Sequence, residues 1–378
     1  DVYKRQIMTQ PSQSPCKSPF EPNERLRHLI GLHFHPEWGS AYWLNRQEKM
    51  GWNVPDRIRC MDDLWKLGPM PHEDLRTHPA KSFIPKAFHD QLTHFIVGET
   101  AGTSGKPSVT AFRRDEFQEA FISPFLKVVE ITGFPKKETW LWVGPTGPHI
   151  IGKVVRELAK QTDCMDPFSI DFDPRWAKTL TNGSIARQRY LDHVTRQTMT
   201  VLEREDIGIL FITPPALNAL TPKLTHKQRG QIRGIHYGGM SLTPDMVNEF
   251  RSAFPGAVHL AGYGNTLFGV AMEIVDENRV HMDYFPMGER VVFQTVHCTN
   301  PNAPPTSWPP QATKSNEPGR VLFHRLDESC LLVGMLERDQ AILIPPTPRA
   351  IALGARTCGL RNPRPLESMT ENIQLGIY

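Results

Sequence analysis

The 378-residue sequence lacks the signals that mark several specialised protein classes. Its 6 cysteines show no CxxC spacing, which argues against a zinc site or a dense disulfide framework. No apolar run approaches transmembrane length, and the N-terminus lacks the basic-then-apolar order of a signal peptide. The formal net charge of +3 gives no argument for a nucleic-acid partner or an anionic membrane. We expect a protein of the reducing cytoplasm, with no nucleic-acid partner and no membrane span.

The chain is long enough, and at 39% hydrophobic residues apolar enough, to bury a large core. Residues 1–6 resemble a translated sequencing adapter, which makes Met8 the expected start. The stretch up to Pro22 is rich in Ser, Pro and Gln and is expected to be disordered. We therefore predict a lead-in over 1–22, a core over 23–345 and a C-terminal tail over 346–378.

Short β-rich runs alternate with helical patterns in the middle of the chain. The predicted strands are 139–143, 168–172, 207–213, 232–237 and 257–261. The predicted helices are 117–131, 151–160, 190–202 and 246–254. Such alternation predicts an α/β sheet with helices on both faces.

Closely spaced strand-like runs follow, and they predict an antiparallel sheet or barrel attached to the α/β core. These runs are 270–275, 279–284, 290–296, 320–326 and 330–336. After Pro345 the sequence is rich in proline and shows little periodicity, so no regular element is predicted there.

The most specific signal is a loop of small, hydroxylated and glycine residues. It consists of Thr100, Ala101, Gly102, Thr103, Ser104, Gly105, Lys106 and Pro107. Glycines let backbone N–H groups approach phosphate oxygens, hydroxyls add donors, and the lysine adds positive charge. A Walker A loop would need Gly at position 100 and Ser or Thr at position 107, so this is a different loop. It predicts a polyphosphate site, with a plain Gly/Ser turn as the alternative.

This loop resembles the phosphate-binding motif of the adenylate-forming (AMP-forming, acyl-activating) superfamily. Further segments in the same order resemble its phenylacetate-CoA ligase and acyl-protein synthetase branch: 61–70, 74–76, 212–215, 235–240 and 262–266. The resemblance covers about residues 57–341 and implies the α/β large-domain fold of these enzymes. In that fold, helix-covered and largely parallel sheets are joined to a small antiparallel β subdomain. Only 39 residues follow Asp339, so we expect the C-terminal mobile domain of the family to be absent or truncated.

The resemblance also implies the residues of an ATP/AMP site. Residues similar to the family's adenine segment are Gly238, Gly239 and Met240, and those similar to its adenine and α-phosphate motif are Tyr263, Gly264, Asn265 and Thr266. Asp339 corresponds to the carboxylate that accepts hydrogen bonds from the ribose hydroxyls, and Lys106 and Thr266 are the expected catalytic residues. His149 is a candidate substrate contact, with a helix-capping or solvent-facing histidine as the alternative. The alternatives are a core aromatic for Tyr263 and a surface salt bridge of Glu337, Arg338 and Asp339.

One position departs from the family pattern. Leu267 stands where the family has a glutamate that helps to hold Mg²⁺, and leucine offers no oxygen ligand. Glu273 is a candidate replacement, although an ordinary strand glutamate facing water is the favoured interpretation. ATP is therefore the expected cofactor, and Mg²⁺ is in doubt.

The resemblance implies ATP-dependent activation of a carboxylic acid, aryl or fatty, to an acyl-adenylate. The acyl group would then pass to CoA or to the thiol of an acyl-accepting protein. Cys358 is a candidate self-acylation site by analogy with acyl-protein synthetases, although an unmodified cysteine is favoured. The alternative function is a catalytically degenerate nucleotide-binding or scaffold protein of the same fold.

Overall fold

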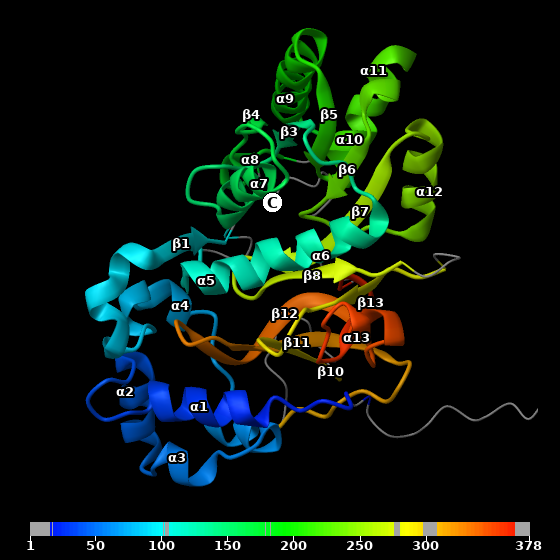
Figure 1. Cartoon of the computed structure of the whole chain (residues 1–378). Helices are drawn as coiled ribbons and strands as arrows, with labels where there is room; N and C mark the ends of the chain where they lie inside the picture. The colour runs from blue at the N-terminus through cyan, green and yellow to red at the C-terminus, as the bar shows by residue number, and fades with distance from the viewer. Residues whose placement is uncertain are drawn as a thin grey trace, which may run out of the picture.

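A mixed 11-stranded sheet runs through the molecule (Figure 1). The computed structural model describes residues 16, 18–100, 102, 106–177, 179–181, 183–275, 280–297 and 308–366. The parallel half of the sheet contains, in spatial order, β4 (Phe168–Ile170), β3 (Thr139–Val143), β5 (Ile207–Ile212), β6 (Gly234–Tyr237) and β7 (Val258–Asn265). The antiparallel half continues with β8 (Gly269–Glu273), β9 (Asp283–Phe285), β13 (Gly359–Pro365), β12 (Leu331–Ile344), β11 (Pro318–Leu326) and β10 (Val291–Val296).

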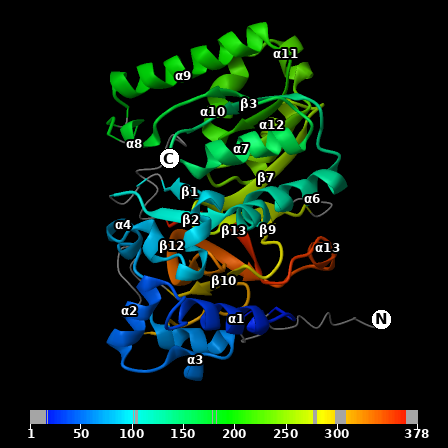
Figure 2. The same cartoon turned by 60° about the vertical axis from the view of Figure 1, so that its left-hand side comes forward.

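Helices and one hairpin surround this sheet. The N-terminal region contains α1 (Asn23–His33), α2 (Ala41–Met50), α3 (Val54–Arg57), η1 (Met61–Leu67), α4 (Asp74–Thr77), η2 (Ala80–Ser82) and η3 (Lys86–His94). The hairpin is β1 (Phe95–Glu99) and β2 (Val109–Arg113). The later helices are α5 (Arg114–Phe117), the π-helical turn η4 (Gln118–Ile122), α6 (Ser123–Thr132), α7 (Ile150–Gln161), α8 (Pro174–Ala177), α9 (Ile185–Arg204), α10 (Pro214–Leu220), η5 (Thr221–Lys223), α11 (His226–Gln231), α12 (Pro244–Ala253) and α13 (Pro348–Ala352). Figures 1 and 2 place α1 to α3 and α9 to α12 at opposite ends of the molecule.

The parallel strands are apolar on both faces because each face packs against helices. On β3, Leu141 and Val143 join a core with α9, α10 and α12, whereas Trp140 and Trp142 join a second core with α6 and α7. The buried residues of α7 follow helical spacing at Ile150, Val154, Val155, Leu158 and Ala159. The sequence prediction of an α/β sheet covered on both faces is therefore confirmed.

The antiparallel half is the attached antiparallel sheet that was one of the two predicted forms, and it continues the parallel sheet edge to edge through the β7–β8 pair and does not form a barrel. The sequence also predicts a tail after 345, but β13 is an internal strand that pairs with both β12 and β9. Strand β13 contains two prolines and two arginines, so apolar alternation does not reveal it. The lead-in is likewise ordered at its end, because the Ser18 hydroxyl donates to the Arg356 carbonyl at 2.7 Å.

A buried carboxylate connects several elements next to the antiparallel half. Asp327 is fully buried and accepts hydrogen bonds from Arg290 and from Arg325, the latter at 2.5 Å from Nε to Oδ2. Arg25 of α1 lies 3.7 Å from its other oxygen. Burial alone would raise the pKa of Asp327, but the two guanidinium groups of Arg290 and Arg325 outweigh burial and lower the pKa. Asp327 therefore stays ionised inside the protein.

The same arginines reach the backbone of neighbouring elements. Arg325 donates to the Thr110 hydroxyl and to the Ala111 carbonyl on β2, each at 2.8 Å. It also donates to the Leu267 carbonyl at 3.2 Å, and Arg290 donates to the Phe268 carbonyl at 2.5 Å. Strand β2 and the turn after β7 are thus tied to one buried charge.

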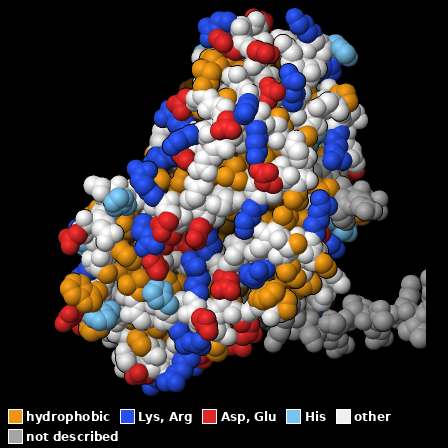
Figure 3. Space-filling model, viewed as in Figure 1, with side chains coloured by type: hydrophobic (Ala, Val, Ile, Leu, Met, Phe, Trp, Pro, Cys, Tyr) orange, Lys and Arg blue, Asp and Glu red, His pale blue; other side chains and the backbone are white. Residues whose placement is uncertain are grey.

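The exposed surface is chemically mixed. On the face in Figure 3, basic and acidic side chains are interspersed over both halves of the molecule, in keeping with the net charge of +3. Among the described residues, no helix is long and apolar enough to cross a membrane.

The substitution Asp327→Asn tests the buried charge. It should lower the free energy of unfolding by about 3 to 5 kcal/mol, because two buried guanidinium groups lose their counter-charge. Urea denaturation would measure the change. The control is Glu130→Gln, which breaks an exposed pair with Lys136 and should cost less than about 1 kcal/mol. Equal losses in the two variants would contradict the central role of Asp327.

Candidate functional site

The predicted phosphate loop joins β1 to β2. Both of its ends are fixed, because the Thr100 N–H donates to the Ser108 carbonyl and the Ser108 N–H donates to the Thr100 hydroxyl, each at 2.9 Å. Gly102 has a positive φ of 63°, a conformation that favours glycine, and Lys106 is exposed. Ala101, Thr103, Ser104 and Gly105 lie outside the described residues. Strand β2 separates this loop from helix α5, so it is a hairpin loop and not a strand-to-helix turn.

Two other predicted residues lie beside the start of this loop. The Thr266 hydroxyl donates to the Glu99 carbonyl at 3.3 Å, and the Glu99 N–H donates to the Pro148 carbonyl at 3.0 Å, one residue before His149. A methyl group on Gly98 would lie 3.1 Å from Thr266 Cγ2 and 2.9 Å from Ile150 Cβ, so the three segments approach closely here. The structure therefore brings Thr100, Thr266 and His149 together.

His149 is 7% exposed and precedes the first residue of α7. Burial, followed by the charge of Arg175, lowers the pKa of its imidazole. A neutral imidazole at this position can donate one hydrogen bond and accept another. Its predicted role as a substrate contact stays a prediction.

The predicted ribose carboxylate lies opposite the predicted adenine motif. On β12, Asp339 accepts a hydrogen bond from the Tyr263 hydroxyl at 2.9 Å, and Glu337 accepts one from the Asn265 amide at 2.6 Å. The two acids are two residues apart and share one face of the strand, as do Tyr263 and Asn265 on β7. Asp339 therefore contacts Tyr263, and the alternative of a surface salt bridge with Glu337 and Arg338 does not describe its surroundings.

Both acids of this pair hold their protons more tightly than a free carboxyl group. Burial and then the negative charge of Glu337 raise the pKa of Asp339 to about 6, although the Tyr263 hydrogen bond acts in the opposite direction. Burial also raises the pKa of Glu337. Perturbed carboxyl groups of this kind often occur at functional sites.

Tyr263 also packs as part of the core. Its ring is partly buried, with ring centroids 6.0 Å from Phe268 and 6.1 Å from Tyr284. Next to it, Gly264 has no room for a side chain, because a Cβ there would lie 2.2 Å from the Gly269 carbonyl oxygen. The tyrosine is therefore a core aromatic whose hydroxyl reaches the candidate site.

The predicted adenine segment follows β6. Strands β6 and β7 pair in parallel, with Tyr237 opposite Ala261. Residues 238–240 therefore leave the sheet at the carboxyl end of β6, where β7 continues through residues 262–265 and pairs with β8. Ligands of open α/β sheets commonly bind at this carboxyl edge. Within this segment, Gly238 has no room for a side chain, because a Cβ there would lie 2.8 Å from the Phe211 ring. Gly239 is exposed and has a positive φ of 80°, and Met240 is partly buried.

The two positions predicted in connection with a metal are both in the interior. Leu267 is 2% exposed and packs in the hydrophobic core. Glu273 is also 2% exposed, so the favoured expectation of a water-facing glutamate is wrong. In the part of the chain that the structure describes, no group of three or more His, Cys, Asp or Glu side chains could hold a metal ion.

Sequence reasoning missed Arg175 and Glu99. Arg175 of α8 donates to the Glu99 carboxylate at 3.2 Å and lies 3.5 Å from Asp173, which places a cation beside the start of the phosphate loop. The order of the elements could have indicated this region, because residues 173–175 follow β4 and the carboxyl ends of parallel strands lie at one edge of a sheet. No sequence motif pointed to Arg175.

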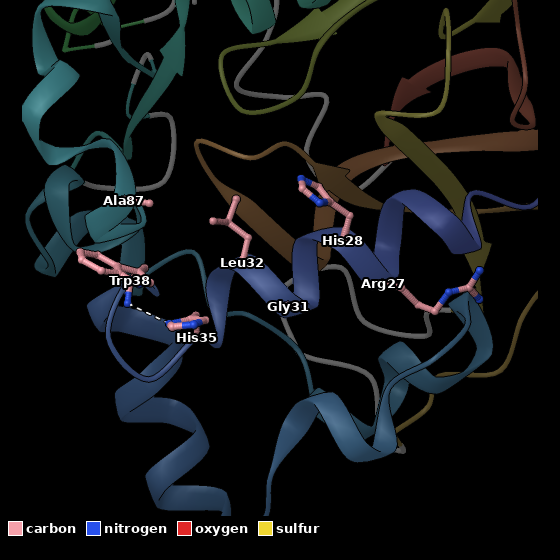
Figure 4. A pocket seen from close by; sticks show the side chains of 7 residues that line it. All are labelled: Arg27, His28, Gly31, Leu32, His35, Trp38 and Ala87. Atoms are coloured by element: carbon pink, nitrogen blue, oxygen red, sulfur yellow. Dashed lines mark hydrogen bonds between the residues drawn. The ribbon is translucent and has the colours of Figure 1, made fainter.

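A separate groove of about 430 Å³ lies along α1, beside Trp38 and Ala87 (Figure 4). Arg27, His28, Gly31, Leu32, His35, Trp38 and Ala87 line it. His35 accepts a hydrogen bond from the Trp38 N–H at 3.3 Å. The groove contains none of the predicted site residues.

Comparison with known proteins gives a structural likeness only. No family model matches the sequence, and no curated protein matches it. A solved structure of 2-hydroxyisobutyryl-CoA ligase with 2-HIB-AMP and CoA has a TM-score of 0.62 at 12% identity over 89% of this chain and 65% of that one. The same ligase in its postadenylation state with R3-HIB-AMP has a TM-score of 0.61 at 10% identity, covering 95% of this chain and 72% of that one.

The likeness shows the fold. An α/β architecture with a large mixed sheet and covering helices matches that of adenylate-forming enzymes, as the sequence resemblance predicted. This chain spans about two thirds of the length of the first of these structures, at 65%.

The raised pKa of Asp339 predicts a pH-dependent stability. The pKa of about 6 in the folded protein exceeds the ordinary aspartate pKa of 3.8, so the folded protein binds the proton more tightly between these values. Stability should therefore fall as pH rises from about 4 to about 6, by roughly 1 to 3 kcal/mol for this group. The variant Asp339→Asn should lack this component when urea denaturation is measured across the same pH range. Identical pH profiles for both proteins would contradict the assignment.

Proposed function

We propose that the protein activates a carboxylic acid with ATP, forming an acyl-adenylate and pyrophosphate. The observation that supports this proposal best is that Thr266 and Tyr263, which belong to one motif, contact two other predicted segments: the Thr266 hydroxyl donates to the carbonyl of Glu99, next to Thr100, and the Tyr263 hydroxyl donates to Asp339. The predicted adenine segment follows β6, which pairs in parallel with the strand that carries Tyr263. A structurally similar ligase has been solved with an acyl-AMP and CoA, which agrees with this chemistry.

The proposed reaction has two steps. A carboxylate oxygen of the substrate attacks the α-phosphorus of ATP, the bond to the bridging oxygen breaks, and pyrophosphate leaves. A thiol then attacks the acyl carbon and AMP leaves. No protein nucleophile is needed, so catalysis comes from positioning the reactants and stabilising negative charge.

Each candidate residue would serve one part of this reaction. Lys106 and the loop amides would hold the departing phosphates, and Thr266 would contact the α-phosphate. The diol of ribose would donate hydrogen bonds to Asp339, with the adenine between Tyr263 and residues 238–240. His149 would lie on the substrate side.

The residues at the two predicted metal positions do not fit a magnesium site. Leu267 offers no oxygen ligand and lies in the core, and Glu273 is buried within β8. We therefore assign no step to a protein-held metal ion and treat ATP as entering with its own magnesium. We further propose that the protein belongs to the phenylacetate-CoA ligase and acyl-protein synthetase branch and acts in the cytoplasm. Its substrate would be an aryl or fatty acid, and the acyl acceptor would be CoA or a protein thiol.

Carboxylate-dependent ATP–pyrophosphate exchange is the direct test, with a panel of aryl and fatty acids. Exchange should depend on one acid class and fall about 100-fold in Lys106→Ala, because a cation on the leaving phosphates is lost. Lys160→Ala is the matched control, since this exposed lysine lies at the other end of α7 from His149, and its exchange should be unchanged. Absence of exchange with every acid, together with measurable ATP binding, would favour a degenerate nucleotide-binding protein.

The ribose contact has its own test. Calorimetry should show that AMP binds about 10- to 100-fold more tightly to the parent protein than to Asp339→Asn, because a charged acceptor is lost. The parent should also prefer AMP to 2′-deoxy-AMP, and the variant should lose much of this preference. Retention of the full preference in the variant would show that Asp339 does not contact the ribose.

A further inference from the structure

The N-terminal segment and the start of β13 meet at a pair of sulfur atoms. Cys16 Sγ lies 3.6 Å from Cys358 Sγ. Two neighbouring contacts hold the same segments together: the Ser18 hydroxyl donates to the Arg356 carbonyl at 2.7 Å, and the Arg356 guanidinium lies 5.0 Å from the centre of the Phe20 ring. The approach of the two sulfurs is therefore part of a packed contact between the two segments.

The two cysteines differ in access and in acidity. Cys16 is partly exposed, whereas Cys358 is 6% exposed. The hydrogen bond with Cys358 lowers the pKa of the Cys16 thiol, although burial opposes this change. The contact with Cys16, and then burial, raise the pKa of Cys358. Cys16 is thus the thiol that ionises first, and it is the one that a dissolved oxidant can reach.

The other cysteines of the described chain have different surroundings. Cys60 is partly exposed, and its thiol donates to the Asp63 carboxylate at 3.3 Å. Burial raises the pKa of Cys164, and burial raises the pKa of Cys330 to about 11. A thiol with a raised pKa forms less of the reactive thiolate, so Cys164 and Cys330 are weaker nucleophiles than Cys16, and Cys60 has no second sulfur described beside it.

We propose that Cys16 and Cys358 form a reversible disulfide when the protein meets a hydroperoxide. The Cys16 thiolate attacks a peroxide oxygen, the O–O bond breaks, and the leaving hydroxide takes up a proton, which gives a sulfenic acid and, from hydrogen peroxide, water. The Cys358 sulfur then attacks the Cys16 sulfur, the S–O bond breaks, and the hydroxyl group leaves as a second water with the Cys358 proton. The two sulfurs together lose two electrons, which reduce the peroxide.

The disulfide would connect residues 342 positions apart and fix the N-terminal segment to the first residues of β13. At its other end β13 pairs with the candidate site strand, with Pro365 opposite Asp339. This site is independent of the proposed ligase activity and would exist in a degenerate protein as well.

Peptide mapping tests the linkage directly. Trypsin should release Cys16 in peptide 6–17 and Cys358 in peptide 357–361, whereas Cys60 and Cys164 fall in peptides 60–66 and 161–175. After hydrogen peroxide treatment of the full chain and alkylation without reductant, mass spectrometry should find 6–17 joined to 357–361. Dithiothreitol should release both peptides. If both remain separately alkylated while Cys60 is oxidised, or if Cys16 joins a different cysteine, the proposal is wrong.

Single substitutions test the order of the two steps. In Cys358→Ser, Cys16 should accumulate as a sulfenic acid that the probe dimedone traps, because the resolving thiol is missing. In Cys16→Ser, dimedone should label Cys358 at least several-fold less than it labels Cys16 in Cys358→Ser. The control Cys60→Ser should form the cross-linked peptide to the same extent as the parent. Equal labelling of the two remaining cysteines would overturn the assignment of Cys16 as the attacking thiol.

Discussion

The buried charge of Asp327 is the interaction on which the geometry of the candidate site depends. Its arginine partners come from α1, from the residue before β10 and from the end of β11, and their remaining N–H groups bind β2 and the backbone of the turn after β7. The guanidinium groups of Arg290 and Arg325 stabilise the buried carboxylate, and each presents its N–H donors in a fixed plane. Strand β2 carries the phosphate loop and the turn follows Thr266, so one charge fixes both sides of the site.

The same network explains how Leu267 fits this fold. Its carbonyl accepts from Arg325, and its N–H donates to the Asn265 side chain at 2.8 Å, so the backbone of the turn is held without any metal ligand. Its side chain fills the core beside residues such as Phe268 and Phe293. The turn therefore keeps its conformation through backbone hydrogen bonds and apolar packing. Leu267 therefore fits this fold through packing and backbone contacts alone, and fold and activity need separate evidence.

Sequence reasoning succeeded where the structure is local. The parallel strands were predictable because runs such as 207–212 are apolar throughout. It failed for β13, whose place between β12 and β9 depends on partners far away in the sequence. The Asp327 network was equally hidden, since Arg25, Arg290 and Arg325 carry no local signal. Glu337 could have been found, because strand alternation places it on the same face as Asp339.

The pairing of Glu337 with Asp339 connects the electrostatics of the site to ligand binding. Two partly buried carboxyl groups on one strand face repel each other when both are ionised, and this repulsion contributes to the raised pKa of Asp339. A vicinal diol donates hydrogen bonds to a carboxylate and so favours its ionised form. Binding of such a ligand therefore releases a proton when the pH is near 6. A nucleoside that bound through its base alone would release none, so proton release reports on the ribose contact independently of catalysis.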